Sequence, residues 1–382
     1  MFSTPFLEEN HRQMADHVDR FVRDQLRGAA LGESEDEQAR YLIRALAREG
    51  LLGYAVPVEF ESGASSLDVR AICVVREQLS YESSLADLMF AMQGLGSFPV
   101  ALAGNSEIKR QLLPEVKSGG AIAAFAITEP EAGSDVSALQ TTARRDGAGY
   151  VLDGVKTFIS NAGLADFYTV FAKTDTAKGN KGISAFVVEK HASGFYFEEK
   201  IDLIAAHPIG RIRFDGCRVP LSNLLGGEGE GFKIAMTTLD TFRPTVGAAA
   251  LGLARRGLDE AISYARRRVQ FGRPLSEFQA TQMKLAEMAT ELDAARLLVY
   301  RAAWKKDTEA GRVTLESAMA KLFATEAAQR IIDAAVQIHG GTGVVRGSVV
   351  EHLYREVRAL RIYEGTSEIQ KLVIAGQLLK EQ

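Results

Sequence analysis

Glu364 is the residue whose setting in the sequence points most directly to chemistry. It lies in the run RIYEGTSEIQ (residues 361–370), and one short amphipathic segment follows. Ser367 and Gln370 have the spacing of a capping box, so we expect a helix to start there and Glu364 to lie on the loop before it. Backbone N–H groups at a helix N-terminus can face a ligand. Taken alone, the pattern is better explained as an ordinary acidic loop residue before an ordinary helix.

Three further stretches offer groups for a cofactor or a substrate. FAITEPEAGSD (125–135) follows a predicted strand and supplies backbone donors and two hydroxyls, which suit a polar planar ring. KTFISN (156–161) is a strand that ends in a hydroxyl and an amide. DTFRP (240–244) is followed by RVQFG (268–272). Each stretch alone is a weak signal, because turns with Pro and Gly and arginines on helix surfaces are common.

Other kinds of site are disfavoured by the sequence. The glycine-rich runs at 226–231 and 340–343 do not lie between a strand and a helix of a βαβ unit, and GxxxxGK[ST] does not occur. HExxH and GxSxG are also absent. The six histidines form no spaced ligand cluster, and Cys73 and Cys217 lie far apart in the sequence. We therefore expect no P-loop or Rossmann site, no metal and no disulfide scaffold.

Composition indicates a soluble enzyme. The 382 residues are 46% hydrophobic and 25% charged, with a net charge of −4. This charge gives no sign of a nucleic-acid or membrane surface. The N-terminus lacks a basic region followed by an apolar run, and we expect no apolar stretch long enough to span a bilayer. A cytoplasmic location is the expectation.

The pattern of elements predicts an α+β protein with three domains. Thr4 as N-cap with Pro5 at the first helical position predicts a helix start, and residues 1–120 have helical periodicity. Residues 121–228 contain short β-like runs, including 150–153, 157–160, 167–173 and 183–189, and a hairpin turn at 146–149. Residues 229–382 are again helical, with the spacing expected of a bundle. The prediction is an all-α domain, an antiparallel β-barrel and a four-helix bundle.

In this order and spacing, the stretches resemble the acyl-CoA dehydrogenase family. The resemblance covers nearly the whole chain. The run GEGFKIAM (229–236) is similar to the medium- and short-chain members in particular. The matching motifs are densest at Thr128–Asp135, Gly227–Arg243, Arg268–Gly272, Gln337–Gly341 and Tyr363–Gln370.

The resemblance implies an FAD-dependent oxidoreductase of fatty acid metabolism. Such an enzyme oxidises an acyl-CoA thioester to its trans-2-enoyl form. Glu364 matches the base that takes the α-proton, while hydride passes from Cβ to flavin N5. Its backbone N–H and a flavin ribityl hydroxyl would stabilise the thioester oxygen. The family pattern further implies FAD contacts from two chains, hence a homodimer at least and a dimer of dimers as our expectation. An electron-transfer flavoprotein is the expected electron acceptor.

The resemblance also assigns site residues by position. The expected FAD contacts are Phe125, Ile127, Thr128, Gly133, Ser134, Phe158, Ile159, Ser160, Arg268, Gln270, Phe271, Gln279, Gln337, Ile338, Gly340, Gly341, Thr366, Ser367 and Glu368. The expected substrate contacts are Ser134, Asp240, Thr241, Phe242, Arg243, Tyr363 and Gly365.

Two departures from the family pattern leave alternatives open. Residues 201–212 lack the usual Gly-x-Arg-x-Ser run, and His207 there suits either a ligand contact or a turn. Phe242 precedes Arg243 where isovaleryl-type members carry their base, which favours Glu364 as the base and leaves acyl chain length and branching open. The alternative functions are an acyl-CoA oxidase, a flavin monooxygenase or a catalytically silent FAD- or CoA-binding subunit. A carrier-protein thioester is an alternative substrate.

Overall fold

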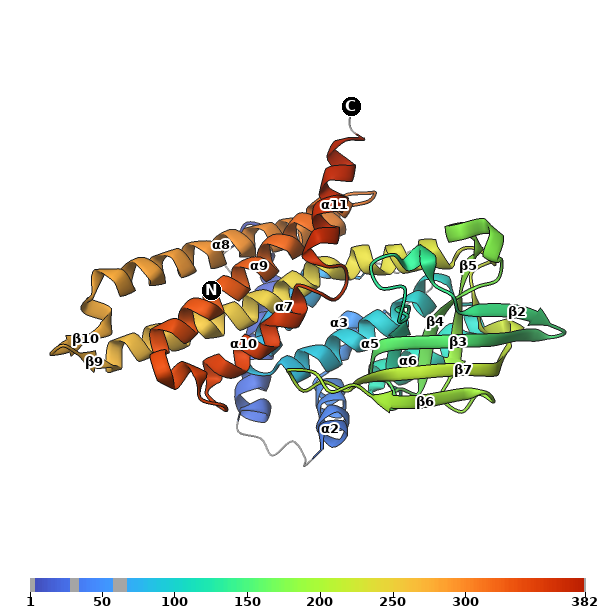
Figure 1. Cartoon of the computed structure of the whole chain (residues 1–382), viewed down its shortest axis with the longest axis horizontal. Helices are drawn as coiled ribbons and strands as arrows, with labels where there is room; N and C mark the ends of the chain where they lie inside the picture. The colour runs from blue at the N-terminus through green and yellow to red at the C-terminus, as the bar shows by residue number, and fades with distance from the viewer. Residues whose placement is uncertain (1–3, 28–33, 58–66, 381–382) are drawn as a thin grey trace. The chain divides into compact units, whose positions relative to one another are not determined.

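The computed structural model describes residues 4–27, 34–57 and 67–380, which form helices and a large sheet (Figure 1). These residues group into two compact units. Unit 1 takes its described residues from 1–29, 68–87 and 240–382, and unit 2 takes its own from 30–67 and 88–239. The division into domains 1–120, 121–228 and 229–382 stays a prediction.

Unit 1 is built mainly of helices. α9 packs against α8, α10 and α11, and α4 packs against α1 and α8. Gly252 of α7 lies so close to α4 that an added Cβ would be 2.3 Å from the Glu77 carbonyl oxygen. The helices are α1 (Glu9–Phe21), α4 (Val69–Glu82), α7 (Gly231–Arg267, in unit 1 from residue 240), α8 (Gln279–Thr308), α9 (Thr314–His339), α10 (Val349–Leu360) and α11 (Ser367–Leu378).

The first helix begins later than the sequence predicts. α1 starts at Glu9, and Thr4 and Pro5 belong to the turn before it. The buried His11 ring accepts a hydrogen bond from the Glu8 N–H at Nδ1 (3.1 Å) and contacts Asp68 through Nε2 (3.0 Å). This contact with a residue distant in the sequence fixes the helix start, so the local signal of Thr4 and Pro5 was wrong.

Unit 2 combines helices with one sheet. The helices are α2 (Glu35–Arg48), α3 (Leu52–Ala55), α5 (Ser84–Ala103, in unit 2 from residue 88) and α6 (Ser106–Ser118). The strands are β1 (Ala123–Ala126), β2 (Thr142–Asp146), β3 (Gly149–Ser160), β4 (Phe167–Lys173), β5 (Ile183–Glu189), β6 (Phe195–Lys200), β7 (Ile209–Pro220) and β8 (Leu224–Leu225).

The sheet has the order β6-β7-β3-β2-β4-β5-β8, with β1 paired to β4. Most pairs are antiparallel as expected, but β1 and β2 both run parallel to β4. The hairpin between β2 and β3 turns where it was predicted, with Asp146 opposite Gly149. The runs predicted at 150–153 and 157–160 form the single strand β3, whose pairing with β7 shifts register twice. The second shift lies between Lys156 and Ile159 and positions part of the candidate site.

Among the residues that the structure describes, one helix is long and apolar enough to cross a membrane. This helix is α5, and 83% of its most apolar window is buried inside the structure. The expectation that no apolar stretch is long enough to span a bilayer was therefore wrong. Isolated polar residues such as Asp87 and Gln93 interrupt the apolar run in the sequence, but the helix as a whole remains apolar. Such burial is typical of a core helix, which passes the same test of length and composition.

Candidate active site

Glu364 lies on the loop between α10 and α11 in unit 1 (Figure 1). Its φ is +53° and that of Gly365 is +95°. A left-handed conformation costs a residue with a side chain roughly 1–3 kcal/mol, and strained residues of this kind cluster at functional sites. A Cβ added to Gly365 would lie 2.5 Å from Gln370 Nε2, so only glycine fits this position without rearrangement. Other contacts must therefore hold the loop in shape.

Two backbone carbonyls of the loop accept hydrogen bonds from buried side chains. The Glu364 carbonyl accepts from Arg243 Nε (3.4 Å) and Gln370 Nε2 (3.3 Å). The Gly365 carbonyl accepts from Lys321 Nζ (2.8 Å) and Gln370 Nε2 (3.1 Å). Lys321 and Gln370 are 0% exposed. Sequence reasoning missed the role of Lys321, and the available signal was a lysine within the apolar helical run around it.

The cap of α11 differs from the predicted one. Thr366 is the N-cap, and its side chain accepts a hydrogen bond from the Ile369 N–H (3.3 Å). Ser367 is the first helical residue, and its hydroxyl donates to Glu326 Oε1 (2.5 Å). Gln370 reaches back to carbonyls of the loop, and its amide donates there. The predicted box of Ser367 and Gln370 was therefore wrong by one residue, because Glu326 of α9 competes for the serine hydroxyl.

The carboxylate of Glu364 is electrostatically unusual. Its Oε2 is shielded from solvent and has no hydrogen-bond partner among the described residues. Burial raises the pKa of the Glu364 carboxyl, while the positive charges of Arg76, Lys321 and Arg243 oppose this rise. A carboxylate with a raised pKa and an unpaired oxygen has the properties of a general base.

The predicted substrate residues at 240–243 have partners within unit 1. Asp240 Oδ1 accepts from Arg243 Nη1 (2.7 Å), and Oδ2 accepts from Thr314 Oγ1 (2.9 Å). Pro244 has no N–H to donate to the Asp240 carbonyl, which instead accepts from Ser317 Oγ (3.3 Å). This part of α7 thus connects α9 to the loop of Glu364.

The other predicted substrate contacts differ in exposure. Thr241 and Phe242 are buried in unit 1, whereas Tyr363 is 37% exposed. Ser134 lies in unit 2 and is exposed.

In unit 2, Phe158 lies at the second register shift of β3. Its φ is +55° and its ring is 57% exposed, although its neighbours Thr157 and Ile159 are buried. A bulge can redirect a side chain out of a strand, and here it presents an aromatic face to the surface. A cavity of about 440 Å³ adjoins the ring and is lined by Pro130, Thr157, Phe158, Glu199, Lys200, Ile201 and Arg211.

A buried ion pair supports this part of unit 2. Lys156 Nζ donates to Glu129 Oε1 (2.8 Å) and to the Ile127 carbonyl (3.1 Å). The Thr157 N–H donates to the Thr128 carbonyl (2.9 Å). Burial lowers the pKa of Lys156 to about 8, and Glu129 opposes this change. The pair joins two of the stretches predicted to contact FAD, although neither residue was among the predicted contacts.

The remaining predicted FAD residues are divided between the two units. In unit 2, Phe125, Ile127 and Ile159 are buried, Thr128 and Ser160 are partly buried, and Gly133 and Ser134 are exposed. In unit 1, the residues whose side chains or backbone are exposed are Arg268, Gln270, Phe271, Gln279, Gln337, Gly340, Gly341 and Glu368. Ile338 and Thr366 are partly buried, and Ser367 is buried.

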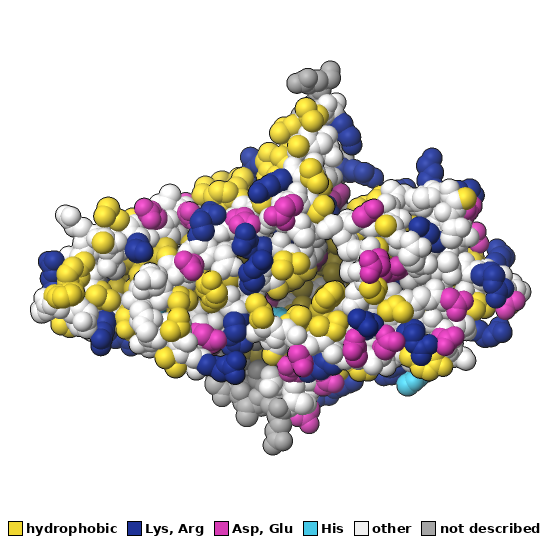
Figure 2. Space-filling model, viewed as in Figure 1, with side chains coloured by type: hydrophobic (Ala, Val, Ile, Leu, Met, Phe, Trp, Pro, Cys, Tyr) yellow, Lys and Arg dark blue, Asp and Glu magenta, His cyan; other side chains and the backbone are white. Residues whose placement is uncertain are grey.

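The hairpin of β9 (Val269–Gln270) and β10 (Arg273–Pro274) carries the most exposed aromatic side chain of the described chain. Phe271 is 92% exposed and has a φ of +51°. Apolar side chains also gather on α11 and its C-cap, where Leu372, Leu378 and the C-cap residue Leu379 are exposed (Figure 2). Both surfaces belong to unit 1.

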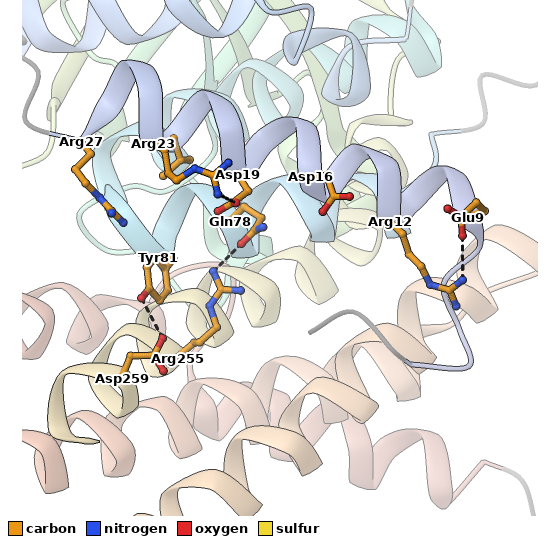
Figure 3. Close-up of a pocket in the computed structure, with 11 residues that line it drawn as sticks. Glu9, Arg12, Asp16, Asp19, Arg23, Arg27, Gln78, Tyr81, Arg255 and Asp259 are labelled. Carbon is orange, nitrogen blue, oxygen red and sulfur yellow. Dashed lines mark hydrogen bonds and ion pairs between the residues drawn. The ribbon is translucent and has the colours of Figure 1, made fainter. Parts of the chain in front are cut away.

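A larger cavity of about 660 Å³ in unit 1 has a charged lining instead of an apolar one (Figure 3). Two pairs of its charged side chains bond each other: Arg12 bonds Glu9 (3.2 Å), and Arg23 bonds Asp19. Tyr81 donates to Asp259 (3.0 Å). This mutual pairing gives no reason to place a ligand there. The described residues also contain no group of three or more His, Cys, Asp or Glu able to hold a metal.

Comparisons with known proteins match this architecture. Models of the acyl-CoA dehydrogenase N-terminal, middle and C-terminal domains match residues 8–120, 124–217 and 229–379. The predicted fold class is thereby confirmed.

Two curated relatives and one solved structure illustrate the similarity. A 3-(aryl)acrylate reductase of Clostridium sporogenes is 41% identical, covering 98% of this chain and 96% of its own. A mitochondrial short-chain specific acyl-CoA dehydrogenase of Rattus norvegicus is 45% identical, and the match covers 88% of this chain and 82% of that protein. A structure of acyl-CoA dehydrogenase complexed with FAD from Bacillus anthracis is 32% identical with a TM-score of 0.88. This match covers 99% of our chain and 68% of the other.

Proposed function

The chain belongs to the acyl-CoA dehydrogenase family, and we propose that it removes the α-proton of an acyl-CoA thioester with Glu364 as the base. It is an FAD-dependent oxidoreductase of the acyl-CoA dehydrogenase type. The observation that carries the assignment of the base is the Glu364 carboxylate, with one buried oxygen left without a partner and a raised pKa. A positioned base of this kind contributes about 10²–10⁴-fold to the rate.

The backbone of Glu364 has a second proposed role. Its N–H forms no hydrogen bond among the described residues, so it is able to donate to a thioester oxygen. Negative charge develops on that oxygen when the α-proton leaves, and one such donor is worth roughly 3–4 kcal/mol. Glu364 would then supply the base and an oxyanion donor from one residue.

The residues of unit 2 suit the flavin of FAD. The exposed ring of Phe158 offers a stacking face, and the adjoining cavity offers space beside it. FAD, when bound, supplies the oxidant that accepts a hydride from the substrate Cβ. We propose that Phe125, Ile127, Thr128, Gly133, Ser134, Phe158, Ile159 and Ser160 contact the cofactor, as do the remaining predicted residues of unit 1.

The proposed substrate contacts are Ser134, Asp240, Thr241, Phe242, Arg243, Tyr363 and Gly365. The 45% identity to the short-chain specific relative supports a short acyl group. The remaining proposals are an electron-transfer flavoprotein as acceptor, a homotetramer and a cytoplasmic location.

The reverse direction is the second candidate function. The relative that is 41% identical is named a 3-(aryl)acrylate reductase. In a reduction, a protonated Glu364 would return its proton to the substrate Cα, and reduced FAD, when bound, would supply the hydride for Cβ. A raised pKa favours the protonated acid, so it suits this direction as well.

Anaerobic mixing of the flavin-loaded enzyme with a panel of acyl-CoAs tests the proposal. Bleaching of the flavin absorption by a saturated thioester supports dehydrogenation. Reoxidation of the reduced enzyme by an enoyl-CoA or an arylacrylate measures the reverse reaction, and rapid reoxidation in air favours an oxidase.

The variant E364Q identifies the base. We expect it to keep bound FAD and acyl-CoA and to bleach at least 100-fold more slowly, because the amide cannot accept the proton. E287Q, which changes an exposed glutamate of α8, is the matched control and should bleach normally. Bleaching of E364Q at the normal rate would show that another group is the base.

A further inference from the structure

Lys321 carries a buried charge that the packing of its own helix does not require. It lies on α9, is 0% exposed and donates to the Gly365 carbonyl at 2.8 Å. Burying an ammonium group costs several kcal/mol unless it is well paired. An apolar side chain of similar length would fill the same space without this cost. The position of this lysine therefore calls for a role outside the packing of α9.

The contacts of Lys321 lead to the loop that presents Glu364. Hydrogen bonds to the carbonyls of Glu364 and Gly365 fix the orientation of two consecutive peptide planes. Those planes define the left-handed turn and therefore the directions of the Glu364 carboxylate and its N–H. Gln370 bonds both carbonyls, Arg243 bonds the first, and Lys321 makes the shortest of the four contacts.

We propose that Lys321 is a positioning residue, whose ammonium holds the Gly365 carbonyl and thereby sets the direction and charge state of the Glu364 carboxylate. This inference rests on the proposed function, in which Glu364 is the base. Lys321 does not touch the reacting atoms, and it acts through the loop.

The charges around the pair make this role dependent on pH. Glu364 is influenced by Arg76 of α4, Lys321 of α9, Arg243 of α7 and Asp87 at the start of α5. Lys321 is influenced by Glu364, Arg243, Glu326 and Glu368. Burial lowers the pKa of Lys321 to about 8, so its charge is lost in mildly alkaline solution. We therefore expect kcat to rise as Glu364 deprotonates and to fall again as Lys321 deprotonates.

The variants K321M and K321R separate positioning from charge. We expect K321M to lower kcat roughly 10- to 100-fold, because a misplaced base loses most of its effect. The acid limb of its kcat profile should move to higher pH, since a cation that lowers the pKa of Glu364 is gone, and the limb near pH 8 should disappear. Arginine stays charged over this pH range, so the kcat profile of K321R should lack the alkaline limb and keep the acid limb in place. K284M, an exposed lysine of α8, is the control.

Thermal unfolding and flavin content distinguish this role from a structural one. A structural lysine would lower the melting temperature when replaced, whereas we expect K321M to be as stable as the wild type and to keep its FAD.

The outcomes that would overturn the inference are specific. The first is a K321M enzyme with unchanged kcat and pH limbs. If K321M does not fold, retention of the alkaline limb in K321R overturns it, and so does a wild-type kcat profile with no limb near pH 8. An active E364Q means that the proposed function has failed, whereas an inactive E364Q beside a normal K321M means that only this inference has failed.

Discussion

Glu364 concentrates three unfavourable features in one residue. It has a left-handed backbone, a raised pKa and a buried oxygen without a partner among the described residues. A residue selected only for stability would not combine them, because each one costs free energy of folding. Residues that act on substrates often show this conflict between activity and stability.

This conflict predicts how stability depends on pH. Because the pKa of Glu364 is raised above 4.5 in the folded state, the folded protein binds this proton more tightly than the unfolded chain does. Its contribution to stability is therefore present below pH 4.5 and is lost as the pH rises through the folded pKa. Each pKa unit of difference between the folded and unfolded states corresponds to about 1.4 kcal/mol in the free energy of unfolding.

We expect E364Q to match the wild type near pH 4 and to be the more stable protein at pH 7. Urea unfolding of both proteins across this range measures the difference, and E287Q controls for the loss of a surface charge. A wild type that gains stability over E364Q as the pH rises would contradict the prediction.

At the scale of elements, the turn between α10 and α11 depends on one glycine. Gly365 has a φ of +95°, and a Cβ there would lie 2.5 Å from Gln370 Nε2. We expect G365A to lose about 1–2 kcal/mol of stability and to displace Gln370 from both loop carbonyls. Activity should fall with it, because the same turn directs Glu364.

Gly376 provides the matched control for this prediction. It lies inside α11, has no positive φ, and an added Cβ meets nothing within 4 Å. G376A should therefore stabilise the protein by up to about 1 kcal/mol and leave activity unchanged. Equal effects of the two substitutions on stability and bleaching rate would show that the turn imposes no special demand.

The sequence predicted elements best where the local pattern decides them. β4 and β5 begin and end at the predicted residues, because each is a buried run of β-formers between turn residues. The Thr4 helix start and the Ser367 cap failed for a common reason. Side chains distant in the sequence, His11 with Asp68 and Glu326 with Ser367, decide those positions.

The candidate site was predictable to a similar extent. Glu364 and Phe158 were identified through their motifs, and each has a backbone conformation that motifs alone do not reveal. Lys321 and Lys156 were missed as supporting residues. Each contacts a loop that is distant from it in the sequence, and such pairings have no local signature.

At the scale of the whole molecule, the proposed residues for FAD belong to both units, and those of unit 1 include the exposed hairpin of β9 and β10. Phe271 at the hairpin tip is 92% exposed in a single chain and has a left-handed backbone. Within its own chain the ring contacts the Phe278 ring edge-on, with centroids 6.3 Å apart, and most of its surface stays in solvent. A second copy that covers the ring would account for both features, and this agrees with the proposed homo-oligomer.

The variant F271G tests this explanation, because glycine removes the ring and relieves the backbone strain at the same time. If Phe271 is covered by a partner subunit, the association free energy should weaken by about 1.5–3 kcal/mol for each buried ring that is removed. Light scattering should then show a smaller assembly at low protein concentration, and bound flavin should decrease. The control is L221S, which removes an exposed apolar side chain of unit 2 and should leave the mass of the assembly unchanged. If Phe271 faces only solvent, F271G will instead raise the melting temperature, and the mass and flavin content will stay the same at every concentration.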